Sequence, residues 1–336
     1  MRKLLFLVMA LFVLQACETT KEKDYRPPSI GTMNSISVVI NNAMWNGKVG
    51  DKIRELFARP VDGLATEEPI FSLNQLPPSV FTGNTRIGRN VLIIQNSEEN
   101  VARISEDLYA TPQQVAVVKG SSEDEIIKLL DQNAEAMIKN FKEHELLEQQ
   151  SRMRSSKIKE KELLDEFGIT LKLPIVYRIT TQKDKFFWIK RQIQKYEGGL
   201  LVYEVPYNSI PKDSTLSDAL VKMKDSIGKA NIPGRDPDRM WMVTEKAFAP
   251  SITHTTIDNR PAIESKGLWE MKNFLMGGPY VNYLIEDKPN NRYIVLEGFV
   301  FAPSIDKRDY MFELEAIAKS IKFKDDEDFD AEKYKE

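Results

Sequence analysis

The sequence predicts an α+β protein in which a long charged helix joins two αβ-sandwich-like halves. Short runs rich in β-branched residues alternate with amphipathic helical stretches in both parts of the chain, and a long, mostly polar helical stretch separates them. With 336 residues, of which 42% are hydrophobic, the chain can bury one large or two medium cores. We therefore expect a first half over residues 32–167 and a second half over residues 168–323.

The first half is expected to open with a strand and a short helix. The β-branched run Ser35–Ile40 is typical of a strand, and Val49–Phe57 carries apolar residues at helical spacing before Pro60 ends it. Further strands are expected at residues 69–73, 90–95, 101–108 and 114–118.

A long helix is expected to follow these strands. Ser122 and Glu125 form a capping box at its start, and the helical pattern continues with a break near Ser155 and Ser156. Its segment 142–161 is almost wholly polar. We interpret these mixed charges as a solvated helix face, and a partner-binding coiled coil is the alternative.

The second half is expected to contain a similar mixture of elements. Strands are expected at residues 170–181, 186–193, 200–206, 240–248, 263–271, 280–286 and 292–301, and helices at 216–227 and 307–321. Residues 324–336 are expected to form a disordered charged tail. The run Arg89–Ile94 loosely echoes Asn291–Leu296, which a duplicated αβ sandwich would explain. Two unrelated α+β domains and one continuous sheet are the alternatives.

The N-terminal residues are typical of a lipoprotein signal peptide. A basic start is followed by eleven apolar residues, Leu4–Leu14, which are too few to span a bilayer but suit a signal-peptide core. Residues Leu14–Cys17 then resemble a bacterial lipobox. This resemblance implies that residues 1–16 are removed and that Cys17 is acylated and anchors the protein in the lipid bilayer. The alternative is a plain secretion signal followed by a buried cysteine.

Residues 17–31 are expected to form a lipidated tether, because polar residues and the pair Pro27-Pro28 favour an extended path. Glu18 follows the cysteine, in place of the aspartate that marks inner-membrane retention among bacterial lipoproteins. We therefore expect an outer-membrane lipoprotein of the cell envelope. Acidic and basic residues alternate after the cysteine, which favours the periplasmic face over the cell surface.

Composition and motifs disfavour several classes of function. A net charge of −3 lacks the basic excess of a general nucleic-acid binder, so no nucleic-acid partner is expected. The single cysteine excludes an intrachain disulfide framework and a cysteine-rich metal site. The sequence contains neither a Gly-x-Ser-x-Gly elbow nor a zinc-protease helix motif. We expect His144 to be solvated and His254 to lie at a strand edge, and we predict no metal, cofactor or catalytic residue.

Carboxylates are the acid–base groups that remain for catalysis. Glu264 and Glu270 would share one face of a strand about 20 Å apart, beyond the roughly 5–10 Å that glycoside hydrolysis needs. Glu297 lies in a strand whose large apolar residues indicate a central position. We expect Glu297 to pair with an arginine or a lysine, and a carboxyl group with a raised pKa is the alternative.

Three segments and the lipobox together resemble one protein family. The segments are Trp45–Asp51, Gly267–Glu270 running to Met276–Tyr280, and Ala302-Pro303 followed by Lys307-Arg308. They resemble an uncharacterised family of Bacteroidota lipoproteins with a domain of unknown function, over roughly residues 30–323. The resemblance implies an envelope lipoprotein and assigns no activity.

Two classes of function remain after these exclusions. We expect a membrane-anchored envelope lipoprotein that acts as a non-catalytic binding or assembly module, with an envelope protein or a glycan as its partner. The alternative is an Asp/Glu-dependent envelope hydrolase that acts on glycan or peptidoglycan.

Two loops of the second half are the expected binding surface. Residues 232–239 are too polar and proline-rich for a strand, and residues 273–279 contain a glycine pair that lets the backbone approach closely or take a positive φ. The candidate binding residues are Arg235, Asp236, Asp238, Arg239, Trp241, Trp269, Met276, Gly277 and Gly278. In the structural alternative, the glycines form a packing turn, both tryptophans are core residues, and the two arginines pair with the two aspartates.

Overall fold

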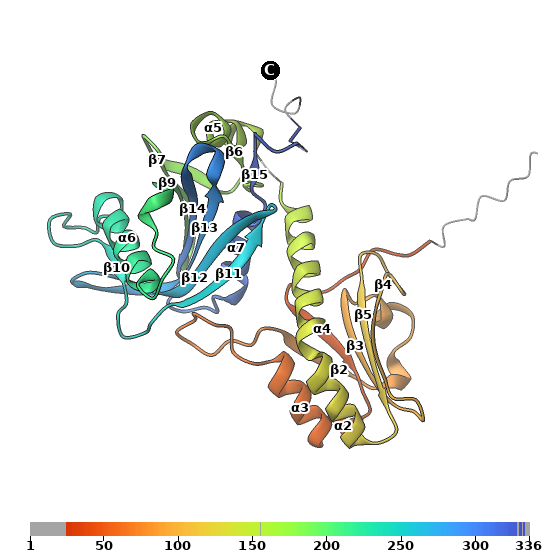
Figure 1. Cartoon of the computed structure of the whole chain (residues 1–336). Coiled ribbons are helices and arrows are strands. Elements are labelled where there is room, and N and C mark those ends of the chain that lie inside the picture. Colours follow the sequence, from red (N-terminus) through yellow and green to blue (C-terminus); the bar gives the residue numbers. More distant parts are fainter. Residues whose placement is uncertain (1–24, 155, 328, 331, 333–336) are drawn as a thin grey trace, which may run out of the picture.

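The structure is a computed structural model that describes residues 25–154, 156–327, 329–330 and 332. It has two halves, and each is built around its own large β-sheet (Figure 1). The expected signal peptide and Cys17 lie outside the described residues. Within the described residues, no helix is both long enough and apolar enough to cross a membrane.

The first half contains a five-stranded sheet in the order β2-β1-β3-β5-β4. Its neighbouring strands are parallel except β4, which is antiparallel to β5. The elements are β1 (Ser35–Val39), α2 (Asn42–Trp45), α3 (Lys48–Phe57), β2 (Ser72–Leu76), β3 (Asn90–Asn96), β4 (Val101–Glu106), β5 (Gln114–Gly120) and α4 (Glu123–Arg152).

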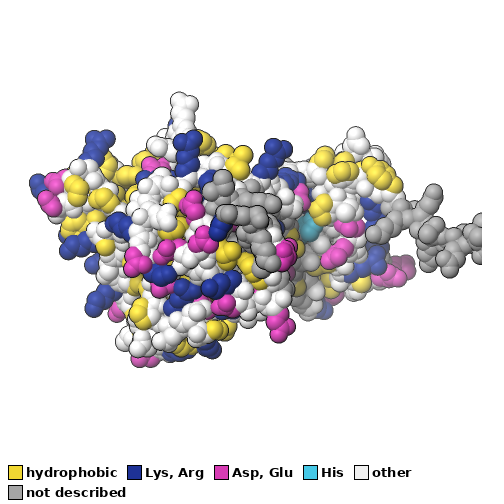
Figure 2. Space-filling model, turned by 90° about the horizontal axis from the view of Figure 1, so that it is seen from above, with side chains coloured by type: hydrophobic (Ala, Val, Ile, Leu, Met, Phe, Trp, Pro, Cys, Tyr) yellow, Lys and Arg dark blue, Asp and Glu magenta, His cyan; other side chains and the backbone are white. Residues whose placement is uncertain are grey.

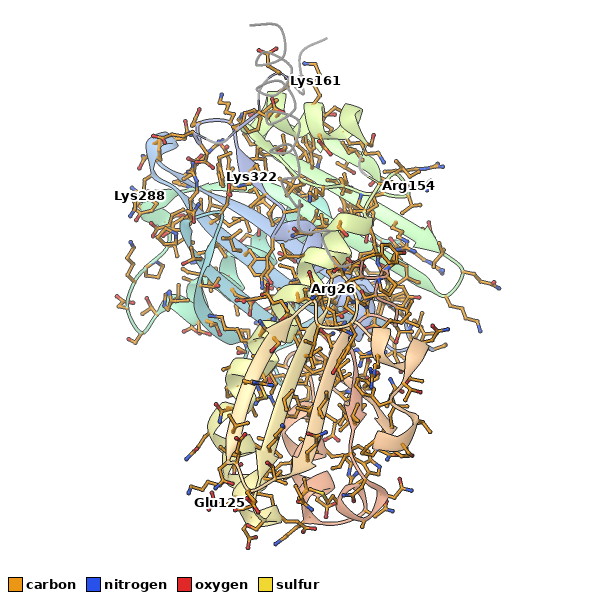
Figure 3. The ribbon with its side chains drawn as sticks, turned by 90° about the vertical axis from the view of Figure 1, so that its right-hand side faces the viewer. Arg26, Glu125, Arg154, Lys161, Lys288 and Lys322 are labelled. Atoms are coloured by element: carbon orange, nitrogen blue, oxygen red, sulfur yellow. The ribbon has the colours of Figure 1, made fainter. Side chains whose placement is uncertain are left out.

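Helices α3 and α4 pack on one face of this sheet, and loop residues cover part of the other face. The apolar run 91–94 in β3 is therefore buried on both sides. Ser122 caps α4 by accepting a hydrogen bond from the Glu125 N–H at 3.2 Å, as the capping box predicts. Figure 3 shows α4 extending from Glu125, at the far end of the first half, towards Arg154 beside the second half.

The second half contains an eight-stranded antiparallel sheet in the order β10-β12-β13-β14-β9-β8-β7, with β11 paired to β12. A small two-stranded sheet of β6 and β15 lies beside it. The elements are α5 (Lys157–Phe167), β6 (Ile169–Thr170), β7 (Arg178–Lys183), β8 (Phe186–Ile193), β9 (Tyr196–Pro206), α6 (Leu216–Asn231), β10 (Met242–Thr244), β11 (Ser251–Ile257), β12 (Arg260–Met271), β13 (Phe274–Asp287), β14 (Arg292–Phe301), α7 (Arg308–Ala318) and β15 (Lys322–Phe323).

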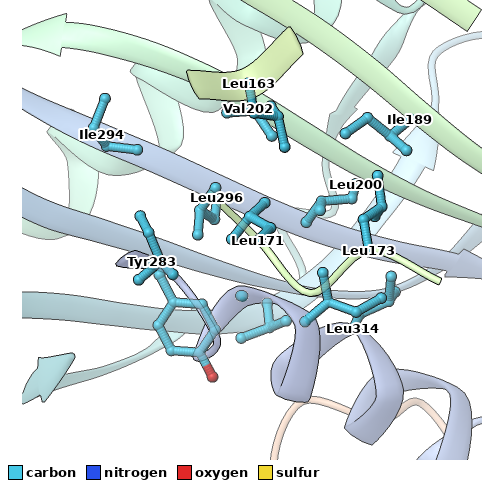
Figure 4. Packing of buried hydrophobic residues seen from close by; sticks show 14 of the residues in the cluster. Leu163, Leu171, Leu173, Ile189, Leu200, Val202, Tyr283, Ile294, Leu296 and Leu314 are labelled. Carbon is cyan, nitrogen blue, oxygen red and sulfur yellow. The ribbon is translucent and has the colours of Figure 1, made fainter. Parts of the chain in front are cut away.

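Helices cover both faces of the second sheet. On one face, Leu163 of α5 and Leu314 of α7 pack against Val202 and Leu296 of the sheet (Figure 4). On the other face, α6 contributes Leu220 to a second core with residues of β9, β12, β13 and β14. The long apolar strands of this half are buried because each face has a helix layer over part of its area.

The α+β class and the two-part layout predicted from the sequence are confirmed. The duplicated sandwich is wrong, because the first sheet is mainly parallel and the second is antiparallel. The echoing runs therefore lie in strands with different neighbours. The expected boundary at residues 167 and 168 also lies too late, since Leu163 and Phe167 of α5 belong to the core of the second half.

Several expected elements differ in their extent. Residues 171–177, expected inside a strand, connect β6 to β7 without regular structure, and β10 is shorter than the strand expected at 240–248. Strand β11 was not expected as an element, although His254 lies on it as an exposed edge residue, as predicted.

The polar segment 142–161 is not the solvated face that the sequence predicts. The break between α4 and α5 falls at residues 153–156, near the expected position. However, Glu145, Gln150 and Glu160 are buried, and His144 is half-buried. The reason is tertiary, because Glu145 bonds to residues of the first half, whereas Gln150 bonds across the joint to the second half.

Hydrogen bonds across the joint hold the two halves together. Glu68 accepts hydrogen bonds from the backbone N–H of Lys307 at 2.9 Å and of Arg308 at 2.7 Å, where α7 begins. A carboxylate is favourable at this helix end. Gln150 donates a buried hydrogen bond to the carbonyl of Ala316 at 2.9 Å. The joint is therefore an ordered polar interface rather than a free linker.

The described residues of the expected tether and of the expected C-terminal tail bond to the two folded halves. The backbone of Ser29 donates to Thr111, and that of Ile30 donates to Ile87, so the end of the expected tether 17–31 packs on the first half. At the other end, Asp326 forms an ion pair with Arg260 at 2.7 Å. The first residues of the charged tail 324–336 are thus bound to the second half.

Candidate binding groove

The structure brings the two predicted binding loops together. The Asn273 side chain donates a hydrogen bond to the Arg239 carbonyl at 2.9 Å, and the Lys272 N–H donates to the Trp241 carbonyl at 2.9 Å. The Arg235 guanidinium lies 5.7 Å from the centre of the Phe274 ring. The two segments therefore form one surface at the tip of the β12–β13 hairpin.

The segment 273–279 is not a loop, which corrects the sequence prediction. Only Lys272 and Asn273 form the hairpin turn, with Asn273 at a φ of 57°, and β13 begins at Phe274. Pro279 lies within β13. The glycine pair permits this, because it lets the strand pass close to its neighbours.

Gly277 and Gly278 are required for close approach rather than for positive φ. A Cβ on Gly278 would lie 2.0 Å from the Val300 carbonyl oxygen, and one on Gly277 would lie 2.6 Å from the Trp269 carbonyl oxygen. The same Val300 carbonyl accepts a hydrogen bond from the Trp269 indole at 3.2 Å. The packing that the structural alternative assigned to these glycines is therefore present, and it adjoins Trp269, which lines a groove.

The groove has a volume of about 570 Å³ and lies on the α6 face of the second sheet. Its aromatic lining comes from Trp188 of β8, Trp269 of β12, Phe274 of β13, and Phe299 and Phe301 of β14. Four methionines complete the lining, namely Met240, Met242, Met271 and Met276. Trp269 is buried, and its ring meets that of Phe299 edge-on at 5.6 Å. The lining is consequently apolar and rich in flexible side chains.

Sequence reasoning missed the contributions of β8 and β14 to this groove. Phe299 and Phe301 alternate with residues of the opposite face along one strand, so their shared face was readable from the sequence. What the sequence does not show is that α6 leaves this end of the sheet face uncovered. That depends on where the helix packs.

One rim of the groove is both apolar and exposed. Leu275 is fully exposed, and Phe274 is 43% exposed. Isolated exposed apolar residues are ordinary, but here they adjoin a continuous apolar groove. Figure 2 shows hydrophobic and basic side chains beside one another at the left-hand end of the molecule, where α6 and β10 lie in Figure 1.

The polar residues of the first loop remain without ionic partners. Within the described residues, no carboxylate lies within ion-pair distance of Arg235 or Arg239, so the expected pairing with Asp236 and Asp238 is absent. On the opposite rim, Lys190 pairs with Glu197 at 3.1 Å. Arg235 is therefore a cation at the groove with its charge uncompensated by a nearby carboxylate.

Trp241 is not a groove residue and is not core, in contrast to Trp269. It is half-buried and forms a wall of a neighbouring cavity of about 910 Å³ between α6 and β10. Two cations lie over its ring, Lys272 at 4.2 Å and Lys229 at 5.2 Å. The structure therefore divides the predicted site residues between two adjacent hollows.

This neighbouring cavity also contains a pair of carboxyl groups. Glu270 shares a hydrogen bond with Glu245, and the pKa of Glu270 is raised by partial burial and by the negative charges of Glu245 and Asp225. Glu264 lies elsewhere, where it pairs with Lys266 at 3.0 Å. Glu264 and Glu270 thus do not converge on one site, as the sequence predicts.

Glu297 forms the ion pair that the sequence predicts. Its partner is Lys224 of α6 at 3.3 Å, and both side chains are buried. Asn282 donates to the other carboxylate oxygen at 3.2 Å. Burial and the nearby Glu297 carboxylate raise the pKa of Tyr203 well above its ordinary value. This cluster attaches α6 to the sheet, and its residues are not part of the groove lining.

A third hollow of about 360 Å³ lies at the joint between the halves. Burial lowers the pKa of Lys142 to about 8, and its ammonium group donates to the Asn34 side chain at 2.8 Å. Burial raises the pKa of Glu315, but the charges of Lys266 and Lys319 outweigh it and hold that pKa at about 2. In the described part of the chain, no group of His, Cys, Asp and Glu residues could hold a metal ion.

Comparisons with known proteins divide the chain at the break between α4 and α5. Residues 29–154 match the family model of a domain of unknown function, DUF8532, and residues 155–320 match that of another, DUF4837. The comparison with curated proteins gives no match.

Among solved structures, the Ran-binding protein Mog1p of Saccharomyces cerevisiae is 10% identical, with 47% of this chain and 91% of that chain covered and a TM-score of 0.30. A mutant of protein Mog1 is also 10% identical, with 47% and 92% covered and a TM-score of 0.28.

Proposed function

We propose that this chain, which contains two domains of unknown function, is a lipid-anchored envelope protein. In this proposal it binds a protein partner and catalyses no reaction. The observation that carries this proposal is the apolar groove of the second half. Both segments that the sequence marks for recognition border it, and its exposed rim carries Phe274 and Leu275.

The chemistry of the groove favours a protein partner over a glycan. Its lining is dominated by methionine, phenylalanine and tryptophan side chains, which offer few hydrogen bonds to sugar hydroxyls. Apolar grooves rich in methionine suit apolar side chains of a partner, because methionine adapts its shape at little cost. We therefore assign the groove to an envelope protein that presents an apolar segment.

The lipid anchor is proposed from the sequence. Residues Leu14–Cys17 resemble a lipobox, and the acyl chains on Cys17 would contribute about 0.8 kcal/mol per buried CH₂ group to membrane attachment. Figure 1 shows the described chain beginning on the right of the first half, whereas α6 and β10 lie at the left-hand end of the second half. A partner in the groove would thus be bound at the opposite end of the molecule from the tether.

The anchor is tested by changing the cysteine. In a bacterial host with lipoprotein processing, the wild-type protein should yield an N-terminal peptide with acylated Cys17 in mass spectrometry and should partition with outer membranes. The Cys17→Ala variant should keep its signal peptide and carry no acyl chain. An unmodified cysteine in a soluble wild-type protein would contradict the proposal.

The groove is tested by crosslinking in intact cells. The variant Leu275→Ser should lose the crosslinked partner, while Leu147→Ser on α4, whose side chain is also exposed, should retain it. Both side chains face solvent, so neither variant should change the midpoint of thermal unfolding. If the two variants retain the same partners as the wild type, the groove is not the binding site.

The alternative function is an Asp/Glu-dependent envelope hydrolase. Glu245 and Glu270 are in hydrogen-bond contact, whereas glycoside hydrolysis places its carboxyl groups at least about 5 Å apart. The pair therefore lacks room for a glycosidic bond between the two groups. Release of soluble fragments from peptidoglycan by the wild-type protein, and its loss in Glu270→Gln, would favour the hydrolase and overturn the binding proposal.

A further inference from the structure

We infer that the partner segment is an amphipathic α-helix of about three to four turns, which lies across the strands in the groove and places a carboxylate against Arg235. This inference rests on the proposed function and names the chemistry of the partner. It follows from the span of the groove, from the incomplete helix layer over the sheet, and from the charge at the rim.

The span of the groove suits a helix of moderate length. The lining crosses the sheet from Trp188 on β8 to Trp269 on β12, which are separated by four steps between neighbouring strands. At about 4.8 Å per step, the strands that carry the groove span about 19 Å. The Trp188 and Trp269 rings lie closer together than their strands, because their centres are 6.4 and 5.6 Å from that of Phe299 between them. An α-helix rises about 1.5 Å per residue, so about 13 residues cover the span of these strands.

The helix layer on this face of the sheet is incomplete. Helix α6 packs over the part of the sheet that contains Tyr203 and Tyr293, whereas Phe301 and Met276 beyond it are only partly buried. The opposite face carries both α5 and α7. A helix in the groove would complete the second layer, as expected for a sheet that buries both of its faces. Partner helices bind other apolar grooves by residues at i, i+3, i+4 and i+7.

The rim adds a charge requirement to this apolar surface. Arg235 lies beside the Phe274 ring, and no carboxylate of the described residues lies within ion-pair distance of it. The other cation of the rim, Lys190, already pairs with Glu197 at 3.1 Å. Charge complementarity therefore favours a partner helix with an aspartate or a glutamate at one end, where this acidic side chain can reach Arg235.

The bound segment can be identified by site-specific photocrosslinking of the full lipidated chain in cells. A photoreactive phenylalanine analogue replaces Leu275 in the groove, and a matched protein carries it at Leu147 on α4. The crosslinked peptide is then sequenced by mass spectrometry. We expect Leu275 to label one protein segment with apolar residues at helical spacing and an acidic residue at one end, and we expect no such product from Leu147.

Charge exchange tests the contact with Arg235. Arg235→Glu should lower the yield of the Leu275 crosslink at least about tenfold, and changing the mapped acidic residue of the partner to arginine should restore it. Arg239→Glu is the matched control and should leave the yield within about twofold, because Arg239, unlike Arg235, is not among the residues that line the groove.

The outcomes separate the inference from the proposed function. A labelled segment that is extended, or that lacks an acidic residue, overturns the helix while leaving a groove-bound protein partner in place. Labelling of lipid or glycan alone overturns both. Equal labelling from Leu275 and Leu147 also overturns both, because it shows no binding in the groove.

Discussion

Glu145 is expected to be one of the most sensitive positions in the chain, although it lies in a stretch of sequence that reads as solvent-exposed helix. Its carboxylate is completely buried and accepts four hydrogen bonds. Arg89 donates two of them, at 2.7 and 3.2 Å, Asn90 donates one at 2.6 Å, and the Asn34 N–H donates one at 2.9 Å. These bonds attach α4 to the residues at which β1 and β3 begin.

The change Glu145→Gln preserves the shape of the side chain but removes its charge. One acceptor oxygen becomes an NH₂ group that faces other donors, and the buried Arg89 guanidinium loses its counter-charge. Breaking a buried ion pair by removing one partner costs about 3–5 kcal/mol. For a folded unit of about 150–250 residues, each kcal/mol of destabilisation lowers the midpoint of thermal unfolding by about 2–4 °C. We therefore expect Glu145→Gln to lower this midpoint by about 6–20 °C.

The measurement is thermal and urea unfolding of a soluble form that begins at Glu18. The control is Glu143→Gln on the same helix, because that side chain is 63% exposed and lies 3.9 Å from its partner Lys139. It should change the free energy of unfolding by less than about 0.5 kcal/mol. The double variant Arg89→Met/Glu145→Met should be less destabilised than the sum of its single variants. Equal stability of Glu145→Gln and Glu143→Gln would refute the reasoning.

Three further variants test other parts of the structure. The pKa of Lys142 is lowered to about 8 from 10.5, so the unfolded chain binds more protons than the folded chain between these pH values. The free energy of unfolding should therefore rise across this range. Lys142→Met should abolish that rise in urea titrations at several pH values. Lys224→Met should lower the free energy of unfolding by about 3–5 kcal/mol in the same assay, because it leaves the Glu297 carboxylate buried without a counter-charge. The control Lys222→Met, at an exposed side chain, should leave this free energy unchanged. Equal effects of the two variants would contradict the ion pair. Gly278→Val should lower the free energy of unfolding by at least about 3 kcal/mol, since its Cβ would lie 2.0 Å from the Val300 oxygen. An unchanged midpoint of thermal unfolding would disprove that close approach.

Local patterns predicted much of the secondary structure because they depend on neighbours in the chain. The β-branched run at residues 35–40 forms β1, and the apolar spacing in 49–57 forms α3. Ser122 caps α4 at the predicted residue. Gly277 and Gly278, however, were interpreted as a loop signal, whereas they serve the approach of β13 to Trp269 and Val300.

The candidate site was predicted in part. The sequence marked residues 232–239 and 273–279, and the structure places both beside one groove. It did not predict that Trp241 faces a separate cavity, and it left open whether Arg235 and Arg239 pair with aspartates, which they do not in the described residues. These features depend on side-chain directions after the hairpin packs against β10, and no local pattern encodes them.

Composition, periodicity and capping residues determined the α+β class, most helix and strand positions, and the expectation of an N-terminal lipid anchor, because each of these depends on residues close together in the chain. Only the tertiary structure decided which polar residues are buried. Glu145 and Glu68 look like surface carboxylates in the sequence, yet one holds α4 to its sheet and the other caps α7 across the joint. Their roles arise from partners that are 56 and 240 positions away, and only folding brings such partners within hydrogen-bond distance.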